Sequence, residues 1–344
     1  MKACHYPKHG ELLIKVSAAS LNPADWKSAK GEQALLLSFK WPRVYGFDFS
    51  GTVVATGGDK EDPSDPIKVG SEVFGMISGL PQRDRGTLAE YVLVSRDVCA
   101  IKPPHVRHLD AAAVPLVSIT AVKMFEACNI KKGAQVFITG GAGGMGTAAI
   151  QLAKCKFGAK TVTTTASPGE KTDLCKKLGA DVVVDYRSTK LEELEGDYDV
   201  ILDCTGEAWK LVHLLGNGGG MCSILAGPTA TALRTWLKES NISPDDIGFG
   251  IRQFLMSEIG GGIFGWVSGG RSLKRACEAK GGATFSHVIG TGNGSIMTDV
   301  AKMMGDGVYK AVIDSTWKLD DSLAAIERQM SGRAKGKVVV NVVE

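Results

Sequence analysis

A glycine-rich stretch near the middle of the chain constrains the fold more than any other feature. Residues 134–154 read AQVFITGGAGGMGTAAIQLAK, in which Gly141, Gly143 and Gly146 have the spacing G-x-G-x-x-G. The apolar run Gln135–Thr139 before them predicts a buried strand. Glycines at this spacing allow a tight turn, let a pyrophosphate approach the backbone, and let the following helix pack closely on the strand.

The residues after the turn complete this pattern. Residues 147–154 predict a helix that packs its alanines and aliphatic residues inward. The N-terminus of such a helix offers unpaired N–H groups to phosphates, so Gly144 and Met145 are also predicted to bind the cofactor. A tight turn in another kind of α/β protein is the alternative, because glycine-rich turns are common. The flanking strand and helix favour a dinucleotide site.

Composition limits the class of protein. The 344 residues suffice for two domains, and the formal charge of +3 without a basic cluster gives no indication of nucleic-acid binding. None of the eight cysteines forms a C-x-x-C pair, which favours reduced thiols over a zinc knuckle or a disulfide framework. The chain opens with neither a signal peptide nor a transit segment. We therefore expect an intracellular, soluble protein of the cytoplasm or an organelle, without an integral membrane segment.

Short strands and turns dominate up to about residue 104 and predict an all-β lobe. A helix is predicted over 109–129, and strands then alternate with helices, as in a doubly wound parallel sheet. After the first strand of that sheet, the predicted strands are Thr161–Ala166, Val182–Asp185, Val200–Cys204, Met221–Leu225 and Phe285–Ile289. Two later strands and a helix are predicted to return to the β-lobe, at Lys310–Ile313, Lys337–Val343 and Asp320–Met330.

One region fits neither lobe. Residues 227–282 are apolar and rich in glycine, but Arg252 and Glu258 interrupt any run long enough to span a membrane. We expect a helix and loop that cover a substrate cleft or a subunit interface.

The second strand of the parallel sheet carries information on the dinucleotide. An acidic residue at its end would bind a ribose 2′-hydroxyl and favour NAD, but this strand ends without a carboxylate. Ser167 and Lys171 follow instead, and Tyr186 follows the third strand. A hydroxyl and a cation suit a 2′-phosphate, so NADPH is the predicted cofactor. The alternative is that Lys171 is only a solvated helix residue.

Several motifs together resemble a known family. They are SLNPADW (20–26), GFDFSGTV (46–53), GTLAEYV (86–92), AAAVPLVSITA (111–121), GGAGGMG (140–146), LGADVVVDY (178–186) and GRAKGKVVV (332–340). They resemble the medium-chain dehydrogenase/reductase superfamily, in particular its zinc-free quinone oxidoreductase branch. Within that branch, the chain is most similar to chloroplast-envelope quinone oxidoreductase homologues, which act on α,β-unsaturated ketones.

The resemblance implies an α/β protein with a GroES-like β-lobe and a Rossmann doubly wound sheet. It implies a GroES-like catalytic domain from residues 1–116 and 306–344 and an NADPH-binding domain from 117–305. It also implies that Thr120, Thr205 and Leu225 line the cofactor, that a homodimer is possible, and that a chloroplast location is possible.

The sequence departs from the zinc enzymes of that superfamily. Their catalytic motif contains a His, whereas this chain reads Gly46-Phe47-Asp48, and residues 78–86 contain no cysteine for a structural zinc site. Zinc needs three or four N, S or O ligands, so no metal site is predicted. Without zinc, the predicted reaction is hydride addition to an enal or enone, with negative charge developing on the carbonyl oxygen.

Two side chains are candidates for that chemistry. Asn22 is predicted as a neutral donor near the nicotinamide, and Lys27 as a donor to the cofactor ribose or a proton relay. Two alternatives are equally open: Asn22 caps the turn that follows it, and Lys27 is a solvated surface residue.

For the whole protein, a reductase acting chiefly on quinones is one alternative, and the substrates could include other oxidised lipids. An NADPH-binding regulatory or structural protein with little turnover is an alternative of another class.

Overall fold

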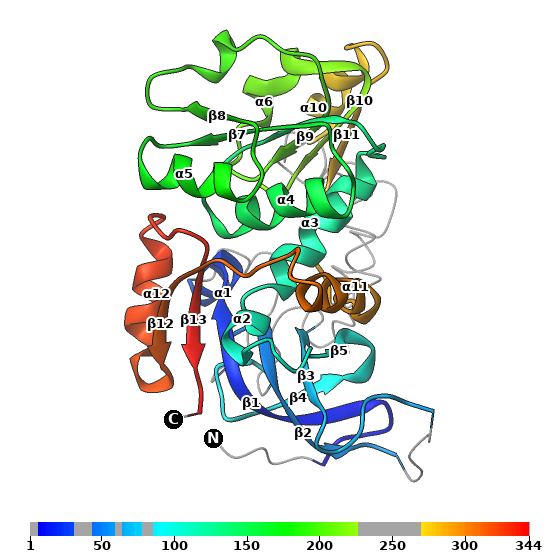
Figure 1. The fold of residues 1–344 in the computed structure, drawn as a ribbon, viewed down its shortest axis with the longest axis vertical. Coiled ribbons are helices and arrows are strands. Elements are labelled where there is room, and N and C mark those ends of the chain that lie inside the picture. Colours follow the sequence, from blue (N-terminus) through cyan, green and yellow to red (C-terminus); the bar gives the residue numbers. More distant parts are fainter. Residues whose placement is uncertain (1–5, 31–42, 59–63, 78–84, 226–269, 344) are drawn as a thin grey trace. The chain divides into compact units, whose positions relative to one another are not determined.

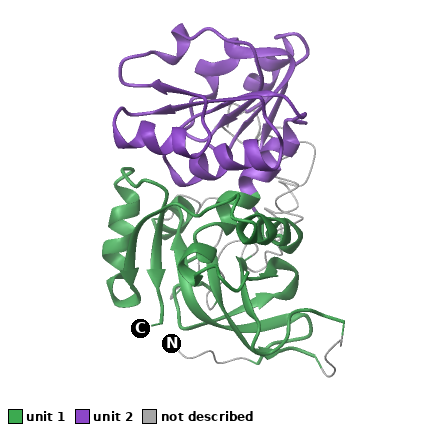
Figure 2. Ribbon diagram, in the orientation of Figure 1, with its two compact units in different colours: residues 1–119, 239–249, 291–344 green, residues 120–238, 250–290 purple. Residues whose placement is uncertain are grey.

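The structure, a computed structural model, describes residues 6–30, 43–58, 64–77, 85–225 and 270–343 (Figure 1). Contacts divide the chain into two compact units (Figure 2). Unit 1 contains the described residues up to Ile119 and from Thr291 onward, and unit 2 contains those between Thr120 and Gly290. Both ends of the chain therefore contribute to unit 1.

Unit 1 is built on a sheet of seven described strands. Their order is β12-β13-β1-β2-β3-β5, and β4 pairs with β1. The strands are β1 (Glu11–Leu21), β2 (Asp48–Thr56), β3 (Glu72–Met76), β4 (Tyr91–Ser95), β5 (Cys99–Ile101), β12 (Ile313–Lys318) and β13 (Lys337–Asn341). The register pairs Leu21 with Val338 and Ser20 with Asp48, so the end of β1 meets the first residues of β13 and β2.

Five of the described helices lie wholly or partly in unit 1. They are α1 (Pro23–Ala29), α2 (His108–Ala112), α3 (Pro115–Ala127), α11 (Gly294–Gly305) and α12 (Ser322–Met330). Proline begins both α1 and α3, where its fixed φ suits the first helical position and its missing N–H costs nothing. The second half of α3 belongs to unit 2.

Unit 2 is a doubly wound parallel sheet. Its strand order is β11-β10-β9-β6-β7-β8, so the chain runs outward from β6 in one direction and then outward from β9 in the other. The strands are β6 (Gln135–Ile138), β7 (Thr161–Ala166), β8 (Val182–Asp185), β9 (Tyr198–Asp203), β10 (Leu215–Ser223) and β11 (Thr284–His287). The point where the order reverses, between β6 and β9, is where such sheets bind ligands.

Helices cover both faces of this sheet. Figure 1 shows α4 (Gly144–Cys155) and α5 (Glu170–Lys177) on one face, and α6 (Ala208–Leu211) and α10 (Gly270–Glu278) on the other. A buried cluster that includes Phe137, Ile201, Leu211, Met221 and Leu273 packs the second face. Burial on both faces explains the continuous apolar runs of the two central strands, Val136–Ile138 in β6 and Val200–Leu202 in β9.

The predicted fold class, a GroES-like β-lobe with a Rossmann sheet, is confirmed. Several predicted elements were placed inaccurately; β10, for example, begins at Leu215 rather than at the predicted Met221. The single helix expected over 109–129 is two helices, because Pro115 lacks the N–H that would continue the first one. The strand expected at 310–313 begins only at Ile313.

Two sequence predictions concern residues beyond 226: the domain boundary at residue 305 and the helix and loop expected over residues 227–282. Helix α11, which the sequence did not indicate, lies in unit 1, and the domain boundary at residue 305 stays a prediction. The expectation for 227–282 falls mostly outside the described residues, apart from α10 and the start of β11. No helix among the described residues is both long and apolar enough to cross a membrane.

Candidate functional site

The glycine turn follows β6 and is held by the neighbouring strand β7. The backbone N–H of Gly140 donates to Thr165 Oγ1 over 2.8 Å, and that of Gly141 donates to the Thr165 carbonyl over 2.9 Å. Gly140 has a φ of +69°, a conformation that glycine adopts without a steric penalty. The hydroxyl of Thr164 donates to the Ile138 carbonyl over 2.7 Å. The threonines of β7 thus fix the path of the turn.

The three glycines of the motif have different surroundings. A Cβ at Gly146 would lie 2.2 Å from the Gly140 carbonyl oxygen, and one at Gly141 would lie 2.3 Å from Thr164 Oγ1. Among the residues that the structure describes, a Cβ at Gly143 would have one neighbour within 4 Å, the Gly140 carbonyl oxygen at 3.4 Å. Gly146 and Gly141 are therefore required by packing within the protein, whereas Gly143 leaves open space beside the start of α4.

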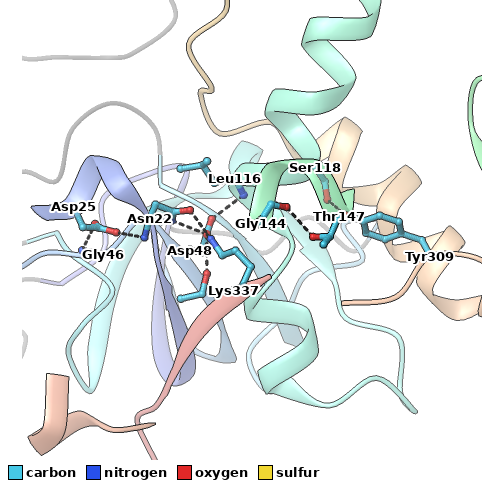
Figure 3. Close-up of polar contacts among 11 residues, drawn as sticks. Asn22, Asp25, Gly46, Asp48, Leu116, Ser118, Gly144, Thr147, Tyr309 and Lys337 are labelled. Atoms are coloured by element: carbon cyan, nitrogen blue, oxygen red, sulfur yellow. Dashed lines mark hydrogen bonds and ion pairs between the residues drawn. The ribbon is translucent and has the colours of Figure 1, made fainter. Parts of the chain in front are cut away.

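Helix α4 begins at this open space. Gly143 occupies the N-cap position with extended backbone, and Gly144 and Met145 form the first turn. The Thr147 hydroxyl donates to the Gly144 carbonyl over 3.0 Å (Figure 3). The first turn contains no acidic side chain, so the N–H groups and positive dipole of this 12-residue helix are available to an anion.

A buried aspartate at the end of β9 organises the other side of the strand-order reversal. Asp203 is fully buried, and its Oδ1 accepts the backbone N–H groups of Thr205, Gly206 and Glu207 at 3.2, 2.9 and 3.0 Å. Its Oδ2 accepts from the Ala208 N–H and the Ser223 hydroxyl at 3.1 and 2.8 Å. One carboxylate thereby caps α6 and joins the carboxyl ends of β9 and β10.

Two predicted cofactor residues lie next to Asp203. A Cβ on Gly140 would approach the Thr205 methyl group to 2.8 Å, which places Thr205 against the glycine turn. Leu225 is half exposed, and its N–H donates to Ser223 Oγ over 3.1 Å. Thr205, Leu225 and the turn therefore gather at the carboxyl ends of the central strands.

The residues predicted to bind a 2′-phosphate follow two paired strands. Ala166 of β7 lies opposite Asp185 of β8, so Ser167 and Tyr186, which come next in the chain, leave the same edge of the sheet. Tyr186 is half exposed, and Lys171 lies in the first turn of α5. This arrangement places a hydroxyl, a phenol and a cation at one corner of unit 2.

Thr120 lies on α3 and is 4% exposed. Its Oγ1 has no hydrogen-bond partner among the residues that the structure describes. A buried hydroxyl without a partner is costly, and a ligand atom would relieve that cost. This fits the predicted contact with the cofactor.

Unit 1 contains a buried polar centre, which we define as Ser20, Asn22, Asp48 and Lys337 (Figure 3). Asp48 Oδ2 accepts from Ser20 Oγ, Asn22 Nδ2 and Lys337 Nζ at 2.9, 2.8 and 3.1 Å. Lys337 Nζ also donates to Asn22 Oδ1. Asp48 Oδ1 accepts the Leu116 N–H over 2.8 Å, which ties the centre to the first turn of α3.

The centre changes the interpretation of two predicted catalytic residues. The side chain of Asn22 is bound within the centre, and its backbone N–H donates to Asp25 over 2.8 Å. Lys27 lies on α1 with its Nζ 5.7 Å from the centroid of the Trp26 ring. The structure therefore joins Asn22 to a charged buried network and gives Lys27 a contact outside it. Both catalytic roles stay predictions.

Asp25 is buried beside the polar centre. Its carboxylate accepts the N–H groups of Asn22 and Gly46 at 2.8 and 2.9 Å, which favours the charged form. Burial is the larger effect, and with the nearby negative charge of Asp48 it raises the pKa of Asp25 from 3.8 to about 7.

This pKa shift predicts a pH dependence of stability. Between about pH 4 and 7, folded Asp25 holds a proton that the unfolded chain has released, so the free energy of unfolding falls as the pH rises through this window. Relative to Asp25→Asn, which cannot titrate, the wild type should lose about 4 kcal/mol between pH 4 and pH 8. Urea unfolding of both proteins at several pH values measures this difference, and a pH-independent difference would contradict the assignment.

Sequence and structure comparisons place these features in a family. Residues 8–104 match the alcohol dehydrogenase GroES-like domain, and residues 178–340 match the zinc-binding dehydrogenase domain. A trans-enoyl reductase from Aspergillus terreus is 31% identical over 342 residues, covering 97% of this chain and 87% of that protein. The chain belongs to the medium-chain dehydrogenase/reductase superfamily. The predicted family is thereby confirmed.

Two further relatives within the superfamily are informative. A chloroplastic NADPH-dependent alkenal/one oxidoreductase from Arabidopsis thaliana is 36% identical over 230 residues, which cover 66% of this chain but only 58% of that protein. The quinone oxidoreductase structure from Coxiella burnetii superposes with a TM-score of 0.75 at 26% identity, covering 99% of this chain and 93% of that one.

Several residues of the site were not predicted from the sequence. Asp203 and Lys337 were not singled out, and Thr164 and Thr165 were considered only as a strand end that lacks a carboxylate. Asp203 had a local signal, because an acidic residue between an apolar strand and a short helix is a typical cap. Lys337 had none, since its partners Asn22 and Asp48 lie about 300 residues away in the chain.

Proposed function

We propose that this protein is an NADPH-dependent reductase that transfers hydride to the β-carbon of α,β-unsaturated aldehydes and ketones. The observation that carries the proposal is the glycine turn at the strand-order reversal, where Gly143 leaves room for a pyrophosphate beside the free N-terminus of α4. The substrate class is supported by two relatives, which are named as an alkenal/one oxidoreductase and a trans-enoyl reductase.

Different groups of described residues fit different parts of the cofactor. The turn from Gly141 to Gly146 would hold the pyrophosphate, and Ser167, Lys171 and Tyr186 would hold the 2′-phosphate. Thr205 and Leu225 would line the middle of the cofactor, and the unpartnered hydroxyl of Thr120 would bind near the nicotinamide. NADPH supplies the hydride when bound.

The protein's own contribution is to stabilise charge and to exclude water. As hydride adds to the β-carbon, negative charge develops on the substrate carbonyl oxygen, and a neutral donor such as Asn22 would stabilise it. Lys27, through a relay, or solvent would deliver the proton to the α-carbon.

We also propose that the reaction does not need zinc. Asp48, which follows Gly46 and Phe47 in the motif where the zinc enzymes carry a histidine, is already bound by Lys337, Asn22 and Ser20. Among the described residues, no three His, Cys, Asp or Glu side chains come together as metal ligands. By resemblance to the family, we also propose that the protein forms a homodimer and lies inside the cell, in the cytoplasm or in an organelle. Relatives carry chloroplastic and mitochondrial names.

The test is NADPH consumption by the purified protein with a short enone, a long-chain enone and a quinone. We expect turnover with the enones, a preference for NADPH over NADH of about 10-fold or more, and no loss of activity with excess chelator. Faster turnover with quinones would favour a quinone reductase, which the Coxiella burnetii structure also suggests. Tight NADPH binding without consumption of any substrate would favour the non-enzymatic alternative.

A further inference from the structure

The side-chain amide of Asn22 contacts a positive charge at its oxygen and a negative charge at its nitrogen. Its Oδ1 accepts from the ammonium group of Lys337, and its Nδ2 donates to the Asp48 carboxylate over 2.8 Å. Rotation of the amide by half a turn would place Nδ2 against the ammonium and Oδ1 against the carboxylate. Both contacts would be repulsive, so the network admits one orientation of this amide.

In this orientation, one of the two Nδ2 hydrogens of Asn22 has no acceptor among the described residues. Nδ2 carries two hydrogens, and among the described residues Asp48 is the one acceptor recorded for it. The side chain is held in a buried environment, where an oriented donor is worth more than in water and needs no reorganisation during the reaction.

We propose that Lys337 is a positioning residue that orients Asn22 so that its second Nδ2 hydrogen faces the substrate carbonyl oxygen. This inference rests on the proposed function. Lys337 itself touches Asn22 and Asp48 and acts through them. The antiparallel pairing of β1 with β13 brings it to Asn22, because Leu21 lies opposite Val338.

A matched control exists in the same unit. Lys102 is also 4% exposed, and its ammonium group binds the Pro103 and Val106 carbonyls and Glu72. None of these partners belongs to the polar centre. Lys102→Met therefore removes a buried ammonium group without altering the contacts of Asn22.

The experiment measures kcat for enone reduction, per folded molecule, in Lys337→Met, Asn22→Ala and the double variant. Lys337→Met and Asn22→Ala should each lower kcat about 10- to 100-fold while the KM for NADPH stays unchanged. The double variant should be no slower than Asn22→Ala, because Lys337 acts through Asn22. Lys102→Met should keep the wild-type kcat. Effects that multiply in the double variant, or an unchanged kcat in Lys337→Met, would overturn the proposal.

A second double variant and an NMR measurement cover the cases in which Lys337→Met folds poorly or the wild type shows no turnover. If Lys337→Met folds poorly because Asp48 is left unpaired, the neutral pair Asp48→Asn with Lys337→Met removes both charges and is expected to show the same loss of kcat. The side-chain amide NMR signals of Asn22, assigned by their loss in Asn22→Ala, give a readout without activity. We expect one sharp pair of signals in the wild type and shifted, broadened signals in Lys337→Met, because Oδ1 loses its donor while Asp48 still accepts from Nδ2. A wild type without turnover but with this NMR change would reject the proposed function alone, and an unchanged NMR pattern would reject the orienting role.

Discussion

Replacing Asp203 with alanine is expected to lower the free energy of unfolding by about 3–5 kcal/mol. The carboxylate is fully buried and accepts four backbone N–H groups and the Ser223 hydroxyl. An unsatisfied buried donor costs about 1–3 kcal/mol, and part of this cost is relieved when water enters the site. We also expect weaker NADPH binding, because Thr205 and the ends of β9 and β10 lose their common anchor.

Asp199 provides the matched control on the same strand. It is exposed, and its carboxylate accepts the Gln135 N–H over 2.8 Å. Asp199→Ala should therefore cost no more than about 1 kcal/mol. Urea unfolding of both variants, together with NADPH titration, separates the two cases. If Asp203→Ala were as stable as Asp199→Ala, the carboxylate would not be the anchor of this strand end.

The parts of the fold that were predictable from sequence are those determined by local patterns. Strands β7 and β8 begin and end at the predicted residues, because each is a short apolar or β-branched run bounded by glycine or polar residues. The glycine spacing likewise identified the turn, since a Cβ at Gly141 or Gly146 would clash with nearby atoms, while Gly143 leaves space beside the start of α4. Local patterns did not predict the break at Pro115. The apolar pattern continues through this proline, but the missing N–H ends one helix and begins another.

The buried polar centre of unit 1 was less predictable for a physical reason. Asn22 was singled out by resemblance, but its partner Lys337 is supplied by the pairing of β1 with β13, a contact between opposite ends of the chain. No periodicity or spacing encodes such a contact. The same pairing explains why a lysine in a C-terminal strand is buried, since Asp48 compensates its charge.

The second large effect concerns the glycines of the turn, which are expected to separate into two classes. Gly146→Ala should destabilise the protein by about 3 kcal/mol or more, because the new Cβ would lie 2.2 Å from the Gly140 carbonyl oxygen and 2.5 Å from the Gly141 Cα. Alanine is favoured over glycine inside a helix by about 1 kcal/mol, so a loss of stability at this position has to come from the backbone clash.

Gly143→Ala should behave in the opposite way. The residue has a negative φ of −80° and open space at its Cβ position, so the free energy of unfolding should change by less than about 1 kcal/mol. The added methyl group would occupy the space proposed for the pyrophosphate, so the Kd for NADPH should rise about 10-fold or more. Thermal unfolding without NADPH and fluorescence titration with NADPH measure the two quantities separately. A stable Gly143→Ala protein that binds NADPH as tightly as the wild type would show that the phosphates lie elsewhere, because no contact with the described residues requires glycine at this position.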